Sequence, residues 1–365
     1  MRMYDIVIVG AGPAGSAFAR FISGHYKVLL LEKRPMEEEN FTKRKCCGGL
    51  LAPDAQKALS RLGMGVPLKV LAEPQLFSVR TLDFDNDLQG FYKRFYLNID
   101  REKFDRWLYF SIGSHVEKKD NVSFLAFLEL NDRIVVDYKE NGEAKSVETR
   151  FLVGADGAGS RIRRSFSPRL PAADYLALQY TYKTPVNTPF YTSIFDKSIT
   201  DFYSWIIPKN GCLLVGGALP VSPVVKETFE KLIVKLKEKG LIQGEVLHKE
   251  ASFICRPRRR RSIQTGTHRL ALIGEAAGFI SPSSAEGISY ALRSGELLAE
   301  CMNRSLNRFH KEYRKKTIPL KINIIIKNIK SFFMYHLFFR KVILRSGLFS
   351  MKVSFLSSLD KNKRN

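Results

Sequence analysis

The sequence contains no uninterrupted apolar run that approaches the roughly eighteen residues needed for a membrane-spanning helix. Cysteine is sparse as well. Its five residues in a chain of 365 are an odd number, which argues against a disulfide framework. Cys46 and Cys47 are adjacent, a spacing that does not suit zinc, so no metal site is predicted. Because a β-strand is expected within the first residues, no signal peptide fits there, and we expect a cytoplasmic protein.

Acidic residues are scarce relative to basic ones. The chain has 36 Asp and Glu against 59 Lys and Arg, which gives a formal net charge of +23. Such an excess suggests an anionic partner, namely a lipid headgroup, a phosphorylated substrate or a nucleic acid. The hydrophobic content of 45% is ordinary for a globular protein, and 365 residues suffice for one large core or two linked ones.

The first thirty residues predict a βαβ unit. Residues 4–9 are a short apolar run without helical periodicity, which is typical of a buried parallel strand. The glycine-rich stretch 10–15 follows at once, then an Ala-rich helix over 16–23 and a second strand over 27–31. In this order of elements, a GxGxxG motif at the first turn indicates a dinucleotide site.

Each glycine of the motif has its own expected role. Gly10 makes the tight turn, Gly12 lets the backbone approach a pyrophosphate, and Gly15 lets helix and strand pack closely. The helix N-terminus then directs its free N–H groups and positive dipole end at the phosphates. Glu32, at the end of the second strand, is placed to accept hydrogen bonds from a ribose diol. We therefore predict a dinucleotide site, against the alternative of a glycine-rich turn without a ligand.

The rest of the chain predicts a mixed α/β protein. Strands are expected at 76–88, 122–130, 133–138, 151–154, 175–184, 190–195, 202–207, 213–219 and 269–274, and helices at 53–62, 100–108, 224–239 and 285–298. Asp100 is the expected N-cap of the helix over 100–108, and Gly240 is the expected C-terminal stop of the helix over 224–239.

Three separated motifs now coincide. They are the N-terminal fingerprint, Asp156-Gly157 with Ser160 and Arg163, and Ile273-Gly274-Glu275-Ala276-Ala277-Gly278. Together, over roughly residues 1–300, they resemble the FAD oxidoreductases of the p-hydroxybenzoate hydroxylase type. The family normally has Gly-Asp in the third motif. Glu275 is one methylene longer and is expected to accept the same hydrogen bond from FAD.

The resemblance implies a Rossmann-like FAD-binding domain with an interleaved β-rich substrate domain, to which we add a helical, basic C-terminal tail. The expected ranges are 1–70, 98–165 and 265–303 for the FAD-binding domain, 71–97 and 166–264 for the substrate domain, and 304–365 for the tail. The residues expected at the cofactor are Gly10, Gly12, Ala14, Gly15, Glu32, Arg34, Cys47, Gly48, Arg101, Asp156, Glu275, Gly287 and Ile288.

Within that superfamily, three stretches resemble the geranylgeranyl reductase family. Cys47-Gly48-Gly49 matches the Cys-Gly stretch that lies against the isoalloxazine in that family. Residues 203–208, Tyr-Ser-Trp-Ile-Ile-Pro, resemble its YxWxFP motif with Ile207 in place of Phe, although Thr200 stands where the family has a proline. Residues 285–288, Ala-Glu-Gly-Ile, resemble its Gly-Glu-Gly-Ile.

The resemblance implies hydride transfer from reduced flavin to a C=C bond, which requires close placement and a proton donor. Cys47 is the candidate catalytic residue. It either donates the proton or shapes the flavin face, and the alternative is a small residue packed beside the ring. Cys46 is expected to be a core thiol. Gly287 and Ile288 are expected to present N–H groups to the flavin O2 edge, with ordinary helix packing as the alternative.

Tyr203 and Trp205 are the candidate substrate-binding residues. By the two-residue period of a strand they share one sheet face, which suits an apolar prenyl wall, although a plain core is the alternative. The arginine-rich run 256–261 has three interpretations: a phosphate clamp, a membrane contact or a solvated basic loop. Because the run has no aromatic residues for base stacking, we do not expect nucleic acid as a partner.

The C-terminal region carries most of the charge excess. From residue 304 to the end there are 16 Lys and Arg against 2 acidic residues, a balance of +14. Ile322, Ile325, Ile329, Phe332 and Phe333 follow helical spacing, while Asn323, Lys327 and Lys330 occupy another face. A basic amphipathic helix of this kind predicts peripheral attachment to the anionic inner face of the membrane. The alternative is a helix packed on the protein's own core.

The sequence therefore favours an FAD-dependent reductase that saturates C=C bonds of a prenyl chain on a lipid or quinone. The expected electron donor is NAD(P)H or a reduced redox protein, although the chain has no second dinucleotide fingerprint. The first alternative is an FAD-dependent monooxygenase or halogenase acting on an apolar or aromatic small molecule. The WxWxIP string typical of halogenases is absent. A second alternative is a non-enzymatic lipid-surface protein that retains FAD structurally.

Overall fold

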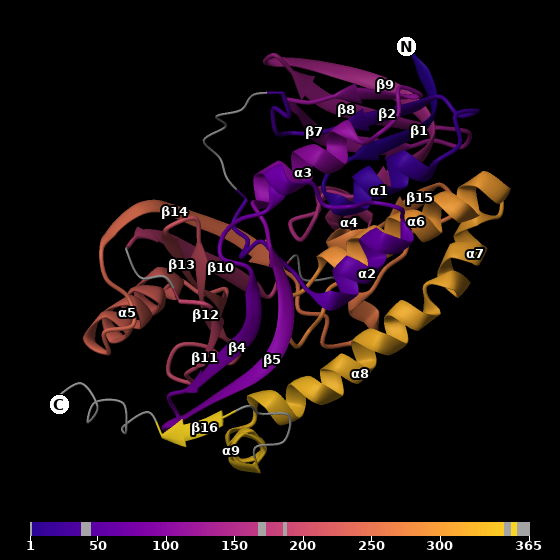
Figure 1. Cartoon of the computed structure of the whole chain (residues 1–365). Coiled ribbons are helices and arrows are strands. Elements are labelled where there is room, and N and C mark those ends of the chain that lie inside the picture. The colour runs from indigo at the N-terminus through magenta and orange to yellow at the C-terminus, as the bar shows by residue number, and fades with distance from the viewer. Residues whose placement is uncertain (1, 38–44, 167–172, 185–187, 347–351, 356–365) are drawn as a thin grey trace.

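Two β-sheets organise the molecule, the first in the upper part of Figure 1 and the second at its lower left. The computed structural model describes residues 2–37, 45–166, 173–184, 188–346 and 352–355. The mixed α/β fold expected from the sequence is confirmed.

The first sheet has seven strands in the order β6-β2-β1-β9-β8-β7, with β15 beside β9. These strands are β1 (Met3–Val9), β2 (Val28–Leu31), β6 (Val116–Lys119), β7 (Val122–Glu129), β8 (Ile134–Glu140), β9 (Glu143–Gly154) and β15 (Leu270–Leu272). β1 pairs in parallel with both β2 and β9, so Ile6 lies opposite Val28 on one side and Phe151 on the other. The apolar runs are buried here as predicted, and the carboxyl ends of these parallel strands meet at one edge.

Helices pack beside the first sheet and at its junction with the second sheet. They are α1 (Pro13–Phe21), α2 (Pro53–Arg61), α3 (Arg101–Phe110), α4 (Arg161–Phe166) and α6 (Ile288–Arg304), with short 3-10 helices η1 (Leu68–Val70), η2 (Arg260–Ser262) and η3 (Gly274–Ala277). Asp100 caps α3 as predicted, because its carboxylate accepts hydrogen bonds from the N–H groups of Glu102 and Lys103. The prediction that a helix begins at Ala285 is wrong. Ala285 has φ +50°, Gly287 is the N-cap, and α6 runs from there to Arg304.

The second sheet has nine strands in the order β14-β10-β13-β12-β11-β4-β5-β16, with β3 beside β5. They are β3 (Leu50–Leu51), β4 (Leu76–Asp83), β5 (Leu88–Asn98), β10 (Tyr175–Lys183), β11 (Tyr191–Phe195), β12 (Ser204–Lys209), β13 (Cys212–Pro220), β14 (Glu245–Ile254) and β16 (Lys352–Phe355). Helix α5 (Val225–Glu238) packs against this sheet through Phe229, Leu232 and Leu236, and Gly240 follows its end with φ +63°.

Among the described strands of the second sheet, four were not predicted: β3, β5, β14 and β16. Strand structure was expected over 76–88, whereas β4 ends at Asp83 and β5 starts only at Leu88, after a turn. β14 is an edge strand whose first five residues are all exposed, so it lacks the apolar alternation by which a strand is recognised.

In its described part, the C-terminal region forms three helices: α7 (Phe309–Lys316), α8 (Ile318–Tyr335) and α9 (Leu337–Ser346). Figure 1 shows α7 and α8 running along one flank, from the first sheet down to the second. Tyr313 and Ile324 are buried on this path, so the region is attached to the body of the protein. Among the described residues, no helix is long and apolar enough to cross a membrane.

Candidate functional site

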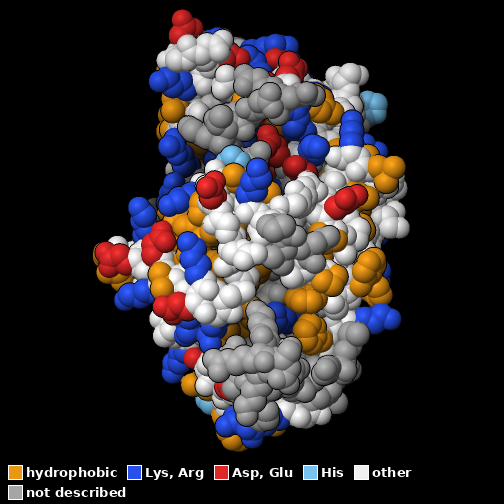
Figure 2. Space-filling view, turned by 60° about the vertical axis from the view of Figure 1, so that its left-hand side comes forward, with side chains coloured by type: hydrophobic (Ala, Val, Ile, Leu, Met, Phe, Trp, Pro, Cys, Tyr) orange, Lys and Arg blue, Asp and Glu red, His pale blue; other side chains and the backbone are white. Residues whose placement is uncertain are grey.

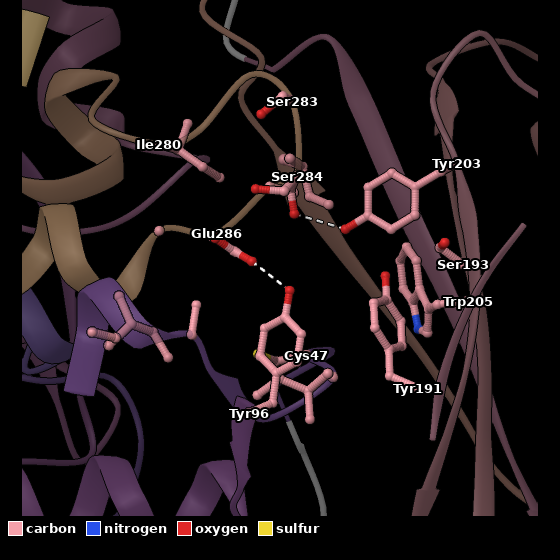
Figure 3. A pocket seen from close by; sticks show the side chains of 18 of the residues that line it. Cys47, Tyr96, Tyr191, Ser193, Tyr203, Trp205, Ile280, Ser283, Ser284 and Glu286 are labelled. Atoms are coloured by element: carbon pink, nitrogen blue, oxygen red, sulfur yellow. Dashed lines mark hydrogen bonds between the residues drawn. The ribbon is translucent and has the colours of Figure 1, made fainter. Parts of the chain in front are cut away.

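A cavity of about 640 Å³ is lined by both halves of the molecule (Figure 3). One end is formed by the start of α1 and by the loop before α6. The opposite side is formed by strands β5, β11 and β12 of the second sheet, and residues of α8 and α9 contribute a further wall. The cavity therefore joins the predicted dinucleotide motif to the predicted substrate wall.

The start of α1 lines one end of the cavity with Gly12, Pro13 and Ala14. Gly12 is the N-cap and has no side chain, so no capping group competes for the first N–H groups of the helix. A Cβ atom built on Gly12 would meet no atom within 4 Å, which leaves the backbone open to an approaching pyrophosphate. This end of the cavity therefore fits the phosphates of the expected FAD.

Gly10 and Gly15 are required for packing. Gly10 has φ +102°, and a Cβ atom on it would lie 2.5 Å from the carbonyl oxygen of Ala155. A Cβ atom on Gly15 would lie 1.9 Å from the carbonyl oxygen of Gly10. Both glycines therefore let helix, turn and strand approach closely, and neither lines the cavity.

Glu32 is fully buried behind this turn. Its carboxylate accepts hydrogen bonds from the N–H of Ala11 at 2.6 Å and from Nε of Arg34 at 2.9 Å. Burial alone favours the neutral acid, but the charge of Arg34 and these hydrogen bonds outweigh it, so the pKa of Glu32 is lowered. An ionised carboxylate has about four acceptor sites, so capacity remains for a ribose hydroxyl.

A chain of buried ion pairs links Glu32 to the cavity. Arg34 Nη1 lies 2.7 Å from Asp105 Oδ2, and Asp105 Oδ1 lies 2.9 Å from Nε of Arg101. Although burial opposes ionisation of Asp105, Arg101 and Arg34 hold its pKa well below the usual range. Arg101 lines the cavity, and Arg34 reaches it only through Asp105.

Cys47 lines the cavity beside Arg101. The Arg101 Nη1 atom lies 3.3 Å from Cys47 Sγ, and the N–H of Gly49 lies 3.4 Å from the same sulfur. Burial favours the neutral thiol, but the charge of Arg101 and the Gly49 hydrogen bond outweigh it, so the pKa of Cys47 is lowered. Cys46 differs. It also borders the cavity, but it packs in a hydrophobic cluster, and burial raises the pKa of its thiol well above the ordinary value.

The two glycines after Cys47 are held by the second sheet. A Cβ atom on Gly48 would lie 2.5 Å from Cδ1 of Ile207, and Gly49 has φ +61°. Lys209, at the end of β12, donates to the carbonyl oxygens of Gly48 at 2.8 Å and of Ile99 at 2.6 Å. Burial lowers the pKa of Lys209 to about 8. The Cys-Gly-Gly loop is therefore fixed against the strand that carries Trp205.

Tyr203 and Trp205 both line the cavity, and their ring centroids are 5.8 Å apart. In Figure 3 they face the cavity together with Tyr191. Their polar atoms are engaged at the edges: Tyr203 donates to the carbonyl oxygen of Ser284 at 2.7 Å, and Trp205 Nε1 donates to Gln179 at 3.0 Å. The rings therefore present apolar faces to the space between them and the Cys-Gly-Gly loop.

Glu286 enters the cavity from the loop before α6. It accepts hydrogen bonds from Tyr96 at 2.8 Å and from Nη2 of Arg94 at 3.0 Å. Gly287 and Ile288 follow it at the start of α6 and also line the cavity. Ala285 adopts φ +50°, a left-handed conformation that suits glycine, the residue expected at this position from the resemblance.

The two other predicted carboxylates lie differently. Asp156 does not line the cavity. Its carboxylate accepts from the N–H groups of Arg161 and Ile162 at the start of α4, at 2.8 and 3.4 Å. Glu275 lines the cavity, and it accepts a hydrogen bond from the N–H of Cys255 at 3.0 Å. Burial raises the pKa of Glu275.

The interpretation of 256–261 as a solvated loop is wrong at Arg256. This residue is buried, and its guanidinium lies over the rings of Phe202 and Tyr335, 4.2 and 4.7 Å from their centroids. Arg258 pairs with Asp201 at 2.6 Å. The first part of the run therefore ties the second sheet to α8.

Several site residues were not predicted from the sequence. They are Asp105, Arg94, Tyr96, Tyr191 and Lys209. Lys209 binds the carbonyl oxygen of Ile99, 110 residues away in the chain, and Asp105 joins Arg101, four residues before it, to Arg34, 71 residues before it. Local spacing therefore does not show that these residues belong to one site. A signal was present for Arg94 and Tyr96. Residues 91–96 read Phe-Tyr-Lys-Arg-Phe-Tyr, so at the two-residue period of a strand Tyr92, Arg94 and Tyr96 share one face.

Comparison with known proteins identifies the first half of the chain. Residues 3–188 match the family described as the FAD binding domain. The chain is also similar to Protein CbrA of Escherichia coli O6:H1, with 38% identity over 349 residues that cover 95% of this chain and 94% of that protein.

Solved structures of similar fold fall into more than one class. A geranylgeranyl bacteriochlorophyll reductase-like protein from Thermoplasma acidophilum has a TM-score of 0.79 at 20% identity, covering 92% of this chain and 89% of its own. The flavin-dependent brominase Bmp2 has a TM-score of 0.66 at 20% identity, covering 94% and 92%. At these identities the likeness concerns the fold, so the reaction has to be argued from the site.

Proposed function

We propose that this chain, which belongs to the FAD binding domain family and is an FAD-dependent oxidoreductase, saturates C=C bonds of a prenyl chain on a lipid or quinone. The observation that carries the proposal is the continuous cavity from Gly12 past Cys47 to the aromatic wall of Tyr203 and Trp205. Its volume of about 640 Å³ is large enough for a flavin ring and part of a long apolar chain together.

Residues at the end of the cavity formed by α1 and α6, together with Glu32 behind the first turn, would hold the cofactor. Gly12 and Ala14 would hold the FAD pyrophosphate, and Glu32 would accept from a ribose diol. Gly287 and Ile288 would direct N–H groups and the positive end of α6 at the pyrimidine edge, where negative charge grows on reduction. FAD, when reduced, supplies the hydride.

Saturation of one C=C bond adds a hydride to one carbon and a proton to the other. Cys47 is proposed to supply the proton from Sγ, because it lies between the cofactor end and the aromatic wall. The thiolate that remains is stabilised by Arg101 at 3.3 Å and by the N–H of Gly49. Tyr203 and Trp205 hold the prenyl chain and exclude water from the reacting carbons.

The electron donor is proposed to be NAD(P)H or a small reduced redox protein. The proposed cofactor and the prenyl chain would together fill the cavity around Cys47. The electron donor therefore has to reduce the flavin before the prenyl chain binds. This order of steps gives ping-pong kinetics, in which the flavin is reduced by the donor and reoxidised by the prenyl chain in separate half-reactions.

Reoxidation of the reduced enzyme tests the proposal. FAD-loaded protein is reduced with dithionite without oxygen and mixed with a polyprenyl lipid, with oxygen or with both. Prenyl lipid alone should reoxidise the flavin. A monooxygenase or halogenase would need oxygen for product formation, and a structural flavin would react with oxygen only. Lack of reoxidation by any prenyl lipid contradicts the reductase.

Replacement of Cys47 tests its role within that reaction. Cys47→Ala should keep FAD but slow reoxidation by the prenyl lipid by about 10²-fold or more, or change the product pattern, because the positioned acid is lost. Cys46→Ala is the matched control, since Cys46 packs in the core and should leave the rate within a factor of about two. Equal rates for wild type and both variants would remove Cys47 from the mechanism.

A further inference from the structure

We infer that the outer face of α8 and α9 is a docking surface for an anionic lipid bilayer, and that the substrate cavity opens beside it. The docking surface is formed by exposed apolar side chains, namely Ile318, Ile322, Ile325, Ile326, Ile329, Phe332 and Phe333 of α8 and Phe338, Val342 and Ile343 of α9. The surface itself stands apart from the reductase proposal, whereas the entry of a prenyl lipid beside it rests on that proposal.

The apolar stripe of α8 points away from the protein. At 3.6 residues per turn, Ile322, Ile325, Ile329 and Phe332 fall on one side of the helix, and all four are exposed. A surface helix packed on its own core places such a stripe inward. Helix α8 does the opposite, and exposed apolar patches of this kind mark interaction sites.

Polar side chains hold the inner face of α8. Asn328 donates to the carbonyl oxygen of Pro257 at 2.8 Å, and Tyr335 donates to that of Ser283 at 2.8 Å. Lys327 lies 3.6 Å from Asp54. Because these contacts fix which face packs inward, the isoleucine stripe cannot turn toward the core without breaking them.

Helix α9 is fixed in the same way. Arg340 is buried and pairs with Asp83 and Asp85, both at 2.7 Å. With Arg340 on its inner side, Phe338 and Val342 remain exposed on the outer side. The docking surface is therefore built on two anchored helices.

The charge of the region selects the occupant. Residues 304–365 carry a balance of +14, and Lys321 and Lys330 lie on either side of the apolar stripe by helical periodicity. An apolar stripe bordered by lysines suits the interface of an anionic bilayer, where the chains of the lysines reach the headgroups. Two copies of this surface would bring like charges together, which disfavours a dimer through it.

The basic character is not confined to this flank. Figure 2 shows Lys and Arg side chains spread over another face of the molecule rather than gathered in one stripe. Long-range electrostatic attraction to anionic lipid therefore acts on the whole protein. At the docking surface, this attraction is combined with the burial of exposed Ile and Phe side chains in the bilayer.

The cavity reaches the docking surface. Lys330, Met334 and Leu344 line the cavity from α8 and α9, and Ile343 both lines it and is exposed. A lipid chain that leaves the bilayer beside α9 can therefore enter the cavity without crossing water, which keeps its apolar surface buried throughout.

Vesicle flotation of the full chain tests the surface. Vesicles of phosphatidylcholine are compared with vesicles that also contain phosphatidylglycerol, at low and high salt, without flavin substrates. The wild type should bind the anionic vesicles and release them at high salt. The triple variant Ile326→Ser, Ile329→Ser, Phe332→Ser should bind at least about tenfold more weakly, because each side chain is more than half exposed and would be buried in lipid.

A matched triple variant controls for the loss of apolar surface in general. Leu68→Ser, Phe77→Ser and Val234→Ser replace residues on η1, β4 and α5 that are also more than half exposed, and they should leave flotation unchanged. Equal flotation of the two triple variants, or a wild type that ignores anionic vesicles, overturns the proposal. A change of oligomeric state by sedimentation in the α8 variant, without an effect on flotation, assigns the surface to self-association and overturns it as well. None of these outcomes depends on flavin turnover.

Discussion

Gly12 is the residue at which cofactor binding can be separated from folding. Its φ is −68°, which any residue adopts, and a Cβ atom there meets no atom within 4 Å. Gly12→Val should therefore fold normally but lose FAD, because the valine occupies the space of the pyrophosphate. The checks are the flavin absorbance of the purified protein and its thermal unfolding midpoint.

Gly65→Val is the matched control for this substitution. A Cβ atom on Gly65 also meets no atom within 4 Å, and Gly65 lies outside the cavity lining, so this variant should stay yellow. A Gly12→Val protein as yellow as the wild type would show that the phosphates bind elsewhere. A colourless wild type that cannot be reconstituted with FAD would contradict the whole account.

Cys47 is predicted to titrate below an ordinary thiol. Its pKa is lowered from 9.0, mainly by Arg101 acting against burial. The thiolate is the form that reacts with iodoacetamide. The rate of alkylation of FAD-free protein should therefore increase with pH along a titration curve whose midpoint lies below 9. Arg101→Gln removes the positive charge and should move this midpoint upward. The same midpoint in both proteins would contradict the assignment, and Cys47→Ala gives the background from other thiols.

Single residues of the site were predictable where the motif is local. Gly10, Gly12, Gly15 and Glu32 belong to one βαβ unit, so spacing alone identified them. Lys209 was missed because its partner Ile99 is 110 residues away in the chain. Asp105 pairs locally with Arg101, but its contact with Arg34 spans 71 residues, so the sequence did not show that it links Glu32 to the cavity. The identification of Cys47 came from the resemblance, since two adjacent cysteines carry no spacing signal of their own.

At the scale of elements, α9 depends on a buried ion pair. Arg340 of α9 pairs with Asp83, the last residue of β4, whose side chain is fully buried. Arg340→Met should lower the free energy of unfolding by about 3–5 kcal/mol, because it leaves the Asp83 carboxylate buried without its partner. Denaturant unfolding measures the change. Lys341→Met is the control, because Lys341 is the next residue of α9 and is only partly buried.

A second substitution separates the ion pair from general disruption of α9. Asp83→Asn combined with Arg340→Met removes the uncompensated charge and should recover part of the lost stability. If the double variant is as unstable as the sum of the two single variants, the cost lies in packing and the proposed anchor is wrong.

Elements were predictable when they had a buried face with a clear period. The apolar strands β1, β2 and β9 and the amphipathic α5 were found for that reason. β14 was missed because it is an exposed edge strand, so apolar residues do not recur at every second position of its sequence. The amphipathic character of α8 was predicted, but a sequence pattern does not state which face packs inward, and polar contacts turned the apolar face outward.

At the scale of the whole molecule, three properties coincide. The chain belongs to an FAD-binding family, its cavity joins the dinucleotide end to an aromatic wall, and an exposed apolar flank adjoins the cavity. The proposed prenyl-lipid substrate would use all three, because it is apolar, long and held in a bilayer. The reductase and the docking surface are thus separate proposals with a common substrate.

The most direct test of the central claim is mass spectrometry of polyprenyl lipids after anaerobic incubation with the FAD-loaded, dithionite-reduced protein. The account predicts products heavier by two hydrogens for each C=C bond reduced, formed by the wild type and lost with Gly12→Val. Unchanged lipid masses under these conditions, from protein that is fully loaded with flavin, would contradict it.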